Sequence, residues 1–387
     1  MLNFEYSQPT KIIFGKDRHN EIGEHIAEYA KYILVVYGSE RIKKSGLLDE
    51  VEKSLEKHGI RYTLLGGVQP NPRVSVAYEG IEICREKGIE MVLAVGGGSV
   101  IDTAKAIAMG VKYNGDVWDI YMKKDTIDDA LPVAAILTLS AAGSEASTST
   151  VMTNEQTGYK RGFNHECLRP VFSILNPQLT CTVPAYQTAC GCADIMMHDI
   201  ERYFTNARDV DLTDRLCEGV LLSVKDNAPK LIKNLDDYEL RANIMWAGTL
   251  AHNDLLSTGR VGDWVTHGMG HEIGAKFDVA HGATLTIMCP AWMKYVYKHD
   301  IARFKQFAER VMGVDTSSMT DEQVALAGID ELKKFFASLG LPTSLKEVGA
   351  DESSIDEMVQ KCSIFGKIGN FVKLDESDIR KIYEMAL

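Results

Sequence analysis

Residues 91–102 read MVLAVGGGSVID, an apolar run that ends at three glycines, followed by a serine and an acid three residues later. The apolar and β-branched residues from Ile89 to Val95 predict a strand buried on both faces of a parallel sheet. Ser99 at an N-cap position, Asp102 three residues later as the acid of a capping box and the helical spacing of VIDTAKAIAM predict a helix that ends at Gly110. This order of strand, glycine turn and helix N-terminus is typical of a phosphate or dinucleotide site.

The same residues would also suit a tight turn without a ligand. Walker A requires glycine and lysine at positions 101 and 102, and GxGxxG requires glycine at 101, where Ile101 stands. Neither nucleotide fingerprint therefore matches. The flanking strand and helix favour the phosphate site over the plain turn.

Strands and helices alternate through the first half of the chain. Apolar runs predict strands at 32–37, 62–65 and 132–139, and helical spacing predicts helices at 47–58 and 74–87. After NPQLTCTVP, residues 176–184, the pattern is almost entirely helical. We therefore expect an α/β dinucleotide-binding domain with a parallel sheet at 1–180 and an all-helical domain at 181–387.

Composition restricts the function classes. The net charge of −12 over 387 residues, without a basic stripe, argues against a nucleic-acid partner. No stretch approaches 18 apolar residues and the N-terminus lacks a signal-peptide pattern, so we expect a cytoplasmic protein without a membrane partner. The eight scattered cysteines favour reduced thiols, and the CGC at 190–192 favours buried thiols over a soft-metal site.

Histidines cluster in the helical half: five of the ten lie between positions 198 and 281. Asp194 and His198 are four residues apart, His267 and His271 repeat this spacing, and His281 follows ten residues later. Residues four apart share one face of a helix. Each histidine alone would suit a surface or a hydrogen-bonded core position, but one carboxylate with several imidazoles favours a site for Fe(II), Zn(II) or Co(II). The HExxH motif of zincins is excluded because position 275 is alanine.

A dinucleotide turn combined with a metal site predicts hydride transfer to a carbonyl that a metal polarises. The chain resembles the iron-containing (group III) alcohol dehydrogenases, in particular their butanol dehydrogenase and NADPH-dependent aldehyde reductase branch. The motifs that match are GGGSVID, TLSAAGSEAS at 138–147, the D-x3-H and H-x3-H-x9-H spacings, PNP at 70–72 and the C-terminal LDESDIRKIYEMA. The resemblance covers nearly the whole chain.

The resemblance implies a dehydroquinate synthase-like architecture and an enzyme that interconverts small to medium aldehydes and primary alcohols. It implies one divalent ion, Fe(II) first and Zn(II) as the alternative, and a proton-relay role for His271. The implied metal ligands are Asp194, His198, His267 and His281. The implied cofactor-binding residues are Asn71, Gly96, Gly97, Gly98, Ser99, Asp102, Thr138, Leu139 and Lys160.

The end of strand 32–37 predicts the choice of cofactor. Folds that select NAD place an acid there, whereas this chain has Gly38 and Ser39, followed by Arg41, Lys43 and Lys44 with Glu40 among them. We therefore expect NADP(H). The N-terminal FEYSQPTKIIF has strand character without an obvious partner nearby, so we expect it to pair across subunits in a homodimer, as the resemblance also implies.

Three other functions stay open from the sequence. An NAD-dependent glycerol or polyol dehydrogenase and a dehydroquinate synthase share the fold, but both are expected to use different metal ligands. A dehydroquinate synthase would also need basic residues near the metal motifs to hold a phosphorylated substrate. The third is a non-catalytic nucleotide sensor with a structural metal, which would show no turnover.

Overall fold

A computed structural model of the chain describes residues 1–38 and 40–387. These residues pack into two compact units. An α/β unit is formed by Ser7–Val183 and Asp236–Thr249, and a helical unit by Met1–Tyr6, Pro184–Leu235 and Leu250–Leu387. The predicted fold class, a parallel-sheet α/β part followed by an all-helical part, is confirmed. Each unit takes in a short segment from the other half of the chain.

The α/β unit is built on a parallel sheet. Its strand order is β1-β8-β5-β4-β2-β3, and every neighbouring pair is parallel. The strands are β1 (Lys11–Phe14), β2 (Tyr32–Tyr37), β3 (Arg61–Leu65), β4 (Met91–Gly96), β5 (Val133–Leu137) and β8 (Phe172–Leu175). β4 and β5 are buried along their whole length, as expected for the middle of a sheet covered on both faces.

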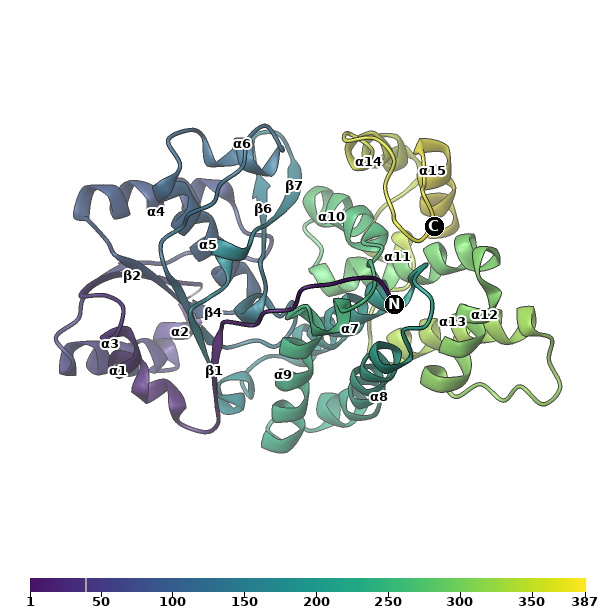
Figure 1. Ribbon diagram of the computed structural model, residues 1–387, viewed down its shortest axis with the longest axis horizontal. Coiled ribbons are helices and arrows are strands. Elements are labelled where there is room, and N and C mark those ends of the chain that lie inside the picture. The colour runs from purple at the N-terminus through teal and green to yellow at the C-terminus, as the bar shows by residue number, and fades with distance from the viewer. Residues whose placement is uncertain (39) are drawn as a thin grey trace. The chain divides into compact units, whose positions relative to one another are not determined.

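Helices cover both faces of this sheet. α4 (Val74–Lys87), α5 (Gly98–Lys112) and α6 (Val117–Tyr121) pack on one face, and α1 (Ile22–Ile26) and α3 (Leu47–Lys57) on the other (Figure 1). The short α2 spans Arg41–Lys44. Leu34 and Val36 of β2 belong to the first core, and Ile33 and Val35 to the second. Alternate side chains of this one apolar strand therefore point to opposite faces of the sheet and contribute to two different cores.

The strand order reverses between β2 and β4. The chain passes from β2 outward to β3 and then returns to place β4 on the opposite side of β2. Ligands of doubly wound sheets bind at such a point, beyond the carboxyl ends of the strands. Tyr37 is in register with Val95, and Gly96 with Leu137, so the ends of β2, β4 and β5 lie at one edge. The glycine turn lies at this edge.

Sequence-based prediction missed three strands. β6 (Ser149–Asn154) and β7 (Tyr159–Asn164) form an antiparallel hairpin, and β8 lies between β5 and β1. Serine, threonine, asparagine and lysine dilute the apolar pattern of the hairpin strands. The four residues of β8 are too few to show a period.

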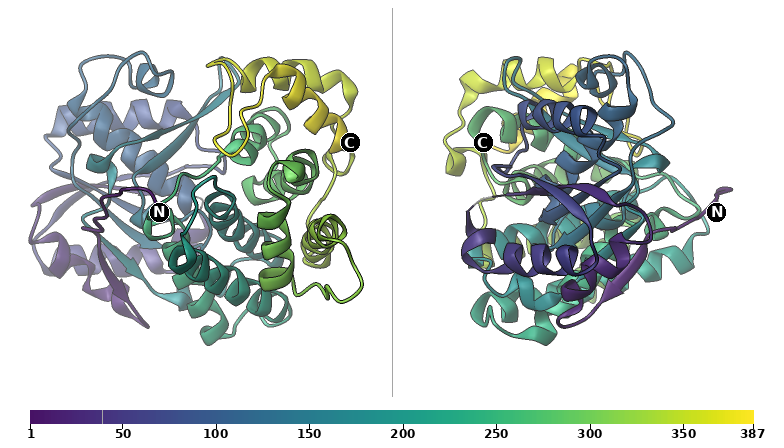
Figure 2. Two further views of the ribbon diagram at one scale, coloured as in Figure 1. Left: turned by 45° about the vertical axis from the view of Figure 1, so that its right-hand side comes forward. Right: turned by 90° about the vertical axis from the view of Figure 1, so that its left-hand side faces the viewer.

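The last residues of the N-terminal segment have a strand partner within the chain itself. Lys11–Phe14 pair with Phe172–Leu175 at the edge of the chain's own sheet. This partner is remote in sequence, so no local pattern could indicate it. Residues 1–10 form neither helix nor strand (Figure 2).

Both ends of α5 differ from the prediction. The N-cap is Gly97 rather than Ser99, and the helix continues beyond Gly110 to Lys112. Gly110 permits close packing of α5 on α4, since a Cβ there would lie 2.2 Å from Cδ1 of Ile81. The glycine therefore marks a helix contact and not a helix end.

The helical unit is centred on α7 (Ala185–Tyr203) and α11 (His281–Val296), which contact each other. α8 packs on α7, and α10 and α13 pack on α11. The bounds of these and the other helices of the unit are Asp211–Lys233 for α8, Val265–Phe277 for α10, Ile301–Phe307 for α12, Asp321–Ser338 for α13, Ile355–Cys362 for α14 and Glu376–Met385 for α15. Helix α9 (Tyr238–His252) belongs to the α/β unit as far as Thr249. Among the helices described here, none has the length and apolar character needed to cross a membrane.

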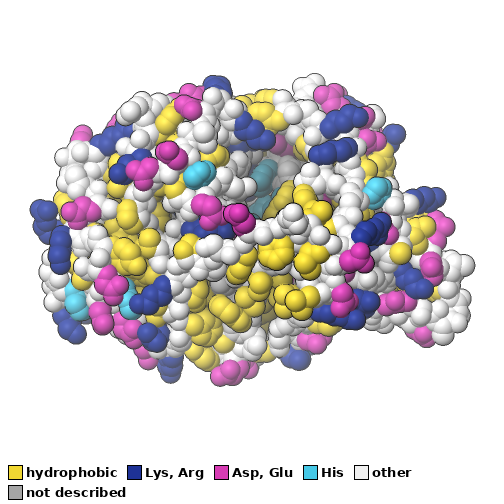
Figure 3. All heavy atoms as spheres, viewed as in Figure 1, with side chains coloured by type: hydrophobic (Ala, Val, Ile, Leu, Met, Phe, Trp, Pro, Cys, Tyr) yellow, Lys and Arg dark blue, Asp and Glu magenta, His cyan; other side chains and the backbone are white. Residues whose placement is uncertain are grey.

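Charges of both signs are mixed on the face shown in Figure 3. Lysine and arginine side chains lie among aspartate and glutamate side chains there and do not gather into one patch. A protein that follows a phosphate backbone needs a concentrated basic surface. This face offers none.

Candidate active site

Helix α7 supplies the first two side chains of the predicted metal centre. Asp194 and His198 lie one turn apart, and each is 3% exposed. Nδ1 of His198 lies 2.9 Å from the backbone carbonyl oxygen of Asp194. Because a carbonyl oxygen only accepts, Nδ1 must donate, and the lone pair of this imidazole is then on Nε2, where a metal can bind.

Helices α10 and α11 bring two more histidines to Asp194. Nε2 of His267 and Nε2 of His281 each lie 3.8 Å from Oδ1 of Asp194. Ligand atoms of these three residues all lie within 4.8 Å of one another. Two bonds of about 2.1 Å to one ion span at most about 4.2 Å, so the 3.8 Å pairs match a shared ion.

The other two predicted residues lie beside this cluster of three. The ring centroid of His198 is 4.5 Å from that of His267, and its Nδ1 is 3.2 Å from Oδ1 of Asp194. The ring centroid of His271 is 5.4 Å from that of His281. The fold thus gathers all five side chains from positions spread between 194 and 281.

Two buried atoms of the cluster lack hydrogen bonds. Oδ1 of Asp194 and Nε2 of His267 have no hydrogen-bond partner within the described part of the chain. Buried polar atoms are normally satisfied, so such atoms facing one another indicate a missing ligand. A carboxylate oxygen and an imidazole nitrogen are donors that suit a divalent ion, and the residues therefore fit the metal that the sequence predicts.

The surroundings set the charges of these groups. Burial opposes ionisation of Asp194, but the imidazoles of His198 and His281 outweigh it and hold its pKa well below the usual range. Burial lowers the pKa of His198. Burial also opposes protonation of His267, yet the Glu201 carboxylate raises its pKa to about 9. His267 thus lies between two carboxylates, Asp194 and Glu201, whose pKa values are both lowered by the neighbouring imidazoles despite their burial.

Sequence analysis missed two neighbours of this centre. Glu201, the next acid on the same face of α7 as Asp194 and His198, hydrogen-bonds Nδ1 of His267. The spacing of 194, 198 and 201 is i, i+4, i+7 and could have indicated it. Trp264 lies with its ring centroid 5.4 Å from that of His267 and is held in the left-handed region at φ 67°. No local sequence signal points to Trp264.

The glycine turn leads into the start of α5, where the sequence predicts an anion site. Its N-cap, Gly97, has no side chain to cap the first turn of the helix, which leaves the backbone there open to an approaching anion. A Cβ on Gly97 would lie 3.1 Å from Cβ of Leu139, and one on Gly98 would lie 3.4 Å from Cβ of Ala142. The turn therefore lies against the segment TLSAAGSEAS, residues 138–147.

Asp102 does not form the capping box predicted with Ser99. Its carboxylate accepts hydrogen bonds from Oγ of Ser144 at 2.6 Å and from the backbone N–H of Val151 at 3.1 Å. Burial raises its pKa to about 6. Asp102 thus links α5 to the loop after β5 instead of capping the helix.

The remaining predicted cofactor residues lie around the same edge of the sheet. Nζ of Lys160 donates to Oδ1 of Asn71 at 2.8 Å, and both side chains are buried. The backbone N–H of Thr138 donates to the carbonyl oxygen of Gly96 at 3.0 Å. Gly38 follows β2, and a Cβ there would lie 3.4 Å from the carbonyl oxygen of Val68. Ser39 lies outside the described residues.

Lys105 is a buried residue that sequence analysis also missed. Its Nζ donates to the backbone carbonyl oxygens of Ser144 at 2.7 Å, Ser147 at 2.8 Å and Ser149 at 2.8 Å. Burial lowers its pKa to about 8. The signal was a lysine inside the apolar run TAKAIAM. Its three N–H donors match three carbonyl acceptors, so Lys105 holds the loop 144–149 on α5.

We expect Lys105→Met to lower the free energy of unfolding by about 3 kcal/mol, because it leaves three buried carbonyl oxygens without a donor. Urea denaturation followed by circular dichroism measures this. Lys112→Met, on the same helix with a side chain 43% exposed, is the control and should change stability by less than about 0.5 kcal/mol. Equal stability of the two variants would contradict the role given to Lys105.

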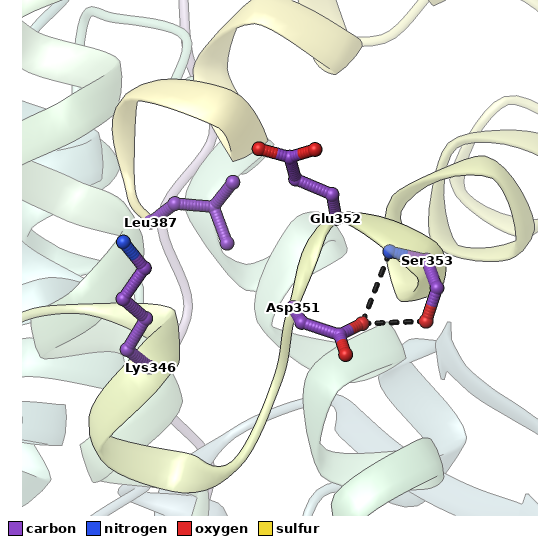
Figure 4. Close-up of a pocket in the computed structure, with 5 residues that line it drawn as sticks. All are labelled: Lys346, Asp351, Glu352, Ser353 and Leu387. Carbon is purple, nitrogen blue, oxygen red and sulfur yellow. Dashed lines mark hydrogen bonds between the residues drawn. The ribbon is translucent and has the colours of Figure 1, made fainter.

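A recess of about 300 Å³ lies in the C-terminal segment and contains no predicted site residue. It is lined by Lys346, Asp351, Glu352, Ser353 and Leu387 (Figure 4). The Asp351 carboxylate accepts from the backbone N–H of Ser353 at 3.0 Å. It therefore caps the short helical turn Glu352–Ser354, and we assign the recess no function.

Comparison with known proteins identifies the family. A family model described as iron-containing alcohol dehydrogenase matches residues 9–177. A second, for the C-terminal part of the Fe-containing alcohol dehydrogenase family, matches residues 188–387. The chain belongs to the iron-containing alcohol dehydrogenase family. This confirms the resemblance, and membership of the family implies a nucleotide cofactor and a metal of the iron type.

Relatives of this iron-containing alcohol dehydrogenase match it along its whole length. The probable NADH-dependent butanol dehydrogenase 1 of Bacillus subtilis (strain 168) is 44% identical, with 100% of both chains covered. The NADPH-dependent aldehyde reductase YqhD of Escherichia coli (strain K12) is 38% identical, again over 100% of both. The crystal structure of NADH-dependent butanol dehydrogenase A from Thermotoga maritima, 38% identical, has a TM-score of 0.96 and covers 100% of this chain and 99% of that chain. The protein is an oxidoreductase of the alcohol dehydrogenase and aldehyde reductase type.

Proposed function

We propose that the protein interconverts small to medium aldehydes and primary alcohols, with NADP(H) as the hydride carrier and one divalent ion. Fe(II) is the ion we propose first, and Zn(II) is the alternative. The observation that supports this best is the cluster of Asp194, His267 and His281, in which the unsatisfied ligand atoms of Asp194 and His267 face one another. Relatives with names of butanol dehydrogenase and aldehyde reductase support the substrate class.

Each residue of the cluster has a proposed role. Asp194, His198, His267 and His281 hold the ion, which when bound polarises a carbonyl oxygen and stabilises the negative charge that develops on it. His271, beside His281 at a centroid distance of 5.4 Å, exchanges a proton with the alcohol oxygen. Burial of Asp194 and His198 keeps bulk water from competing for their ligand atoms.

The edge of the parallel sheet has the matching role for the cofactor. The turn at Gly97 presents the N-terminus of α5 to the phosphates, and the Lys160–Asn71 pair places a cation near the ribose. The residues we propose for cofactor binding are Gly38, Ser39, Asn71, Gly96, Gly97, Gly98, Ser99, Asp102, Thr138, Leu139 and Lys160.

The activity is tested with butanal on anaerobically purified protein of known metal content. We expect reduction of butanal that depends on bound Fe(II) or Zn(II), is abolished by a chelator and is restored when the ion is returned. Oxidation of glycerol with NAD much faster than any aldehyde reduction would instead favour a polyol dehydrogenase. A protein that binds cofactor and metal but turns over neither substrate would be a sensor.

The cofactor preference is a separate prediction. We expect a higher kcat/KM with NADPH than with NADH, because Gly38 stands where NAD-selective folds have an acid and Arg41 and Lys44 lie close behind it. Glu40 weakens the preference for NADPH, because its carboxylate accepts a hydrogen bond from Nζ of Lys43 at 3.0 Å and offsets the positive charge of that lysine. The B. subtilis relative is named NADH-dependent and the E. coli relative NADPH-dependent, so the measurement decides.

The variant Gly38→Asp sharpens this test. A carboxylate at position 38 should repel a 2′-phosphate and move the ratio of the two kcat/KM values towards NADH by about 10-fold, which corresponds to 1.4 kcal/mol. The side chain has room, because its Cβ would meet the Val68 carbonyl oxygen at 3.4 Å and Cγ2 of Val100 at 3.6 Å, both at van der Waals distance. Equal kcat/KM values for NADH and NADPH in the parent protein would contradict the preference.

We also propose a homodimer in the cytoplasm. All eight cysteines are free thiols, as expected in a reducing compartment. The N-terminal residues expose large apolar side chains that a second copy would cover: Met1 (56%), Leu2 (49%), Phe4 (51%) and Tyr6 (42%). A monomeric mass by light scattering would contradict the dimer.

A further inference from the structure

Glu201 is a fully buried carboxylate in the last turn of α7. Its Oε1 accepts hydrogen bonds from the backbone N–H of Thr266 at 2.7 Å, from the backbone N–H of His267 at 3.3 Å and from the hydroxyl of Thr266. Its Oε2 pairs with Nδ1 of His267. All of these contacts are made to two residues at the start of α10, so Glu201 joins α7 to the helix that presents His267.

The contact with Nδ1 determines which nitrogen of His267 is available. A carboxylate accepts from N–H, so Nδ1 bears the proton and the lone pair falls on Nε2. Nε2 is the atom that lies 3.8 Å from Oδ1 of Asp194 and has no hydrogen-bond partner among the described residues. Carboxylates that hold a ligating histidine in this way orient the ring and raise its basicity.

The contacts with the two backbone N–H groups determine where the ring stands. Trp264, the N-cap of α10, adopts φ 67° and has no side-chain cap hydrogen bond. Glu201 satisfies the N–H groups of the first turn instead and places a negative charge at the positive end of the helix. The backbone and the ring of His267 are therefore fixed by one carboxylate.

We propose that Glu201 is a positioning residue of the metal centre, which holds His267 in the tautomer and orientation that bind the ion and adds a second negative charge beside Asp194. This inference rests on the proposed metal site. With neutral imidazoles, the two carboxylates balance the charge of one divalent ion. Glu201 itself does not touch the ion.

The test compares Co²⁺ binding to the metal-free parent protein and to Glu201→Gln, followed by the visible absorption of Co²⁺. We expect the Kd for Co²⁺ to rise by about 10- to 100-fold and the absorption bands to shift. The physical reason is that the amide N–H of glutamine donates to Nδ1, which moves the imidazole proton to Nε2, the atom that must bind the ion.

Thr266→Val is the matched control. It removes the hydroxyl that donates to Glu201 but keeps the carboxylate and its contact with His267. A purely structural role of Glu201 predicts that both variants lower the Tm and leave Co²⁺ binding unchanged. The positioning role predicts that only Glu201→Gln changes the Kd and the spectrum.

Each outcome decides one of the two proposals. Failure of the parent protein to bind one equivalent of Co²⁺ would overturn the proposed metal site itself. Binding by Glu201→Gln with the parent Kd and spectrum would overturn the role of Glu201 alone. If Glu201→Gln does not fold, Glu201→Asp replaces it: its shorter side chain keeps the charge but not all contacts, so parent-level binding would again overturn the inference.

Discussion

Replacing His281 with alanine should leave a folded protein that binds cofactor but has lost its metal and at least three orders of magnitude in kcat. His281 is the first residue of α11 and its side chain is 24% exposed, so the truncation opens no large cavity in the core. It removes one of the proposed ligands, and the remaining groups must bind the ion with fewer bonds. A 1000-fold loss corresponds to about 4 kcal/mol of transition-state stabilisation.

The measurement is metal content beside kcat and cofactor affinity in the same preparation. Cofactor affinity should stay at the parent level, because the phosphates are proposed to bind in the α/β unit. His299→Ala removes an exposed histidine of the helical unit and should change none of the three quantities. A metal-free His281→Ala protein that reduced butanal at the parent rate would rule out the proposed mechanism.

Replacing Gly97 with valine should produce the opposite result, with the metal retained and cofactor binding lost. Gly97 has φ −88° and ψ −169°, a conformation open to any residue, so the effect comes from space and not from backbone strain. A Cβ at this position would already lie 3.1 Å from Cβ of Leu139, and the two methyl groups of valine would cover the helix N-terminus. We expect the Kd for NADPH to rise by about 100-fold, equivalent to about 2.7 kcal/mol.

Fluorescence titration with NADPH and metal analysis of the same sample provide the check. Gly219→Ala in α8 is the control, since a Cβ there meets nothing within 4 Å. It should leave both quantities unchanged. Parent-level NADPH affinity in Gly97→Val would show that the phosphates bind elsewhere.

Much of the fold and of the site could be predicted because local periodicity encodes it. Successive residues of the apolar strand β2 point alternately into the two cores, as the two-residue period of a strand requires. Asp194 and His198 are four residues apart, so both side chains lie on one face of their helix. The glycine turn after β4 depends on residues within a few positions of one another. Such features need only the geometry of a single element.

The errors share one cause, which is competition from remote residues. Ser99 and Asp102 have the spacing of a capping box, but Ser144 and Val151 bind the Asp102 carboxylate instead. Gly110 has the character of a helix end, but Ile81 on α4 requires a glycine inside the helix. A helix cap stabilises a protein by only about 1 kcal/mol, so it does not form when tertiary contacts satisfy the same polar groups better.

The sequence by itself determined the kinds of elements, the glycine turn at the edge of the sheet and the family to which the chain belongs. Only the tertiary structure decided which atoms meet: β1 beside β8, Lys105 under the loop 144–149, and Glu201 on His267. The physical reason is that hydrogen bonds between residues 39 or 66 positions apart form only after packing has brought the two segments together, and no local periodicity in the sequence reports that packing.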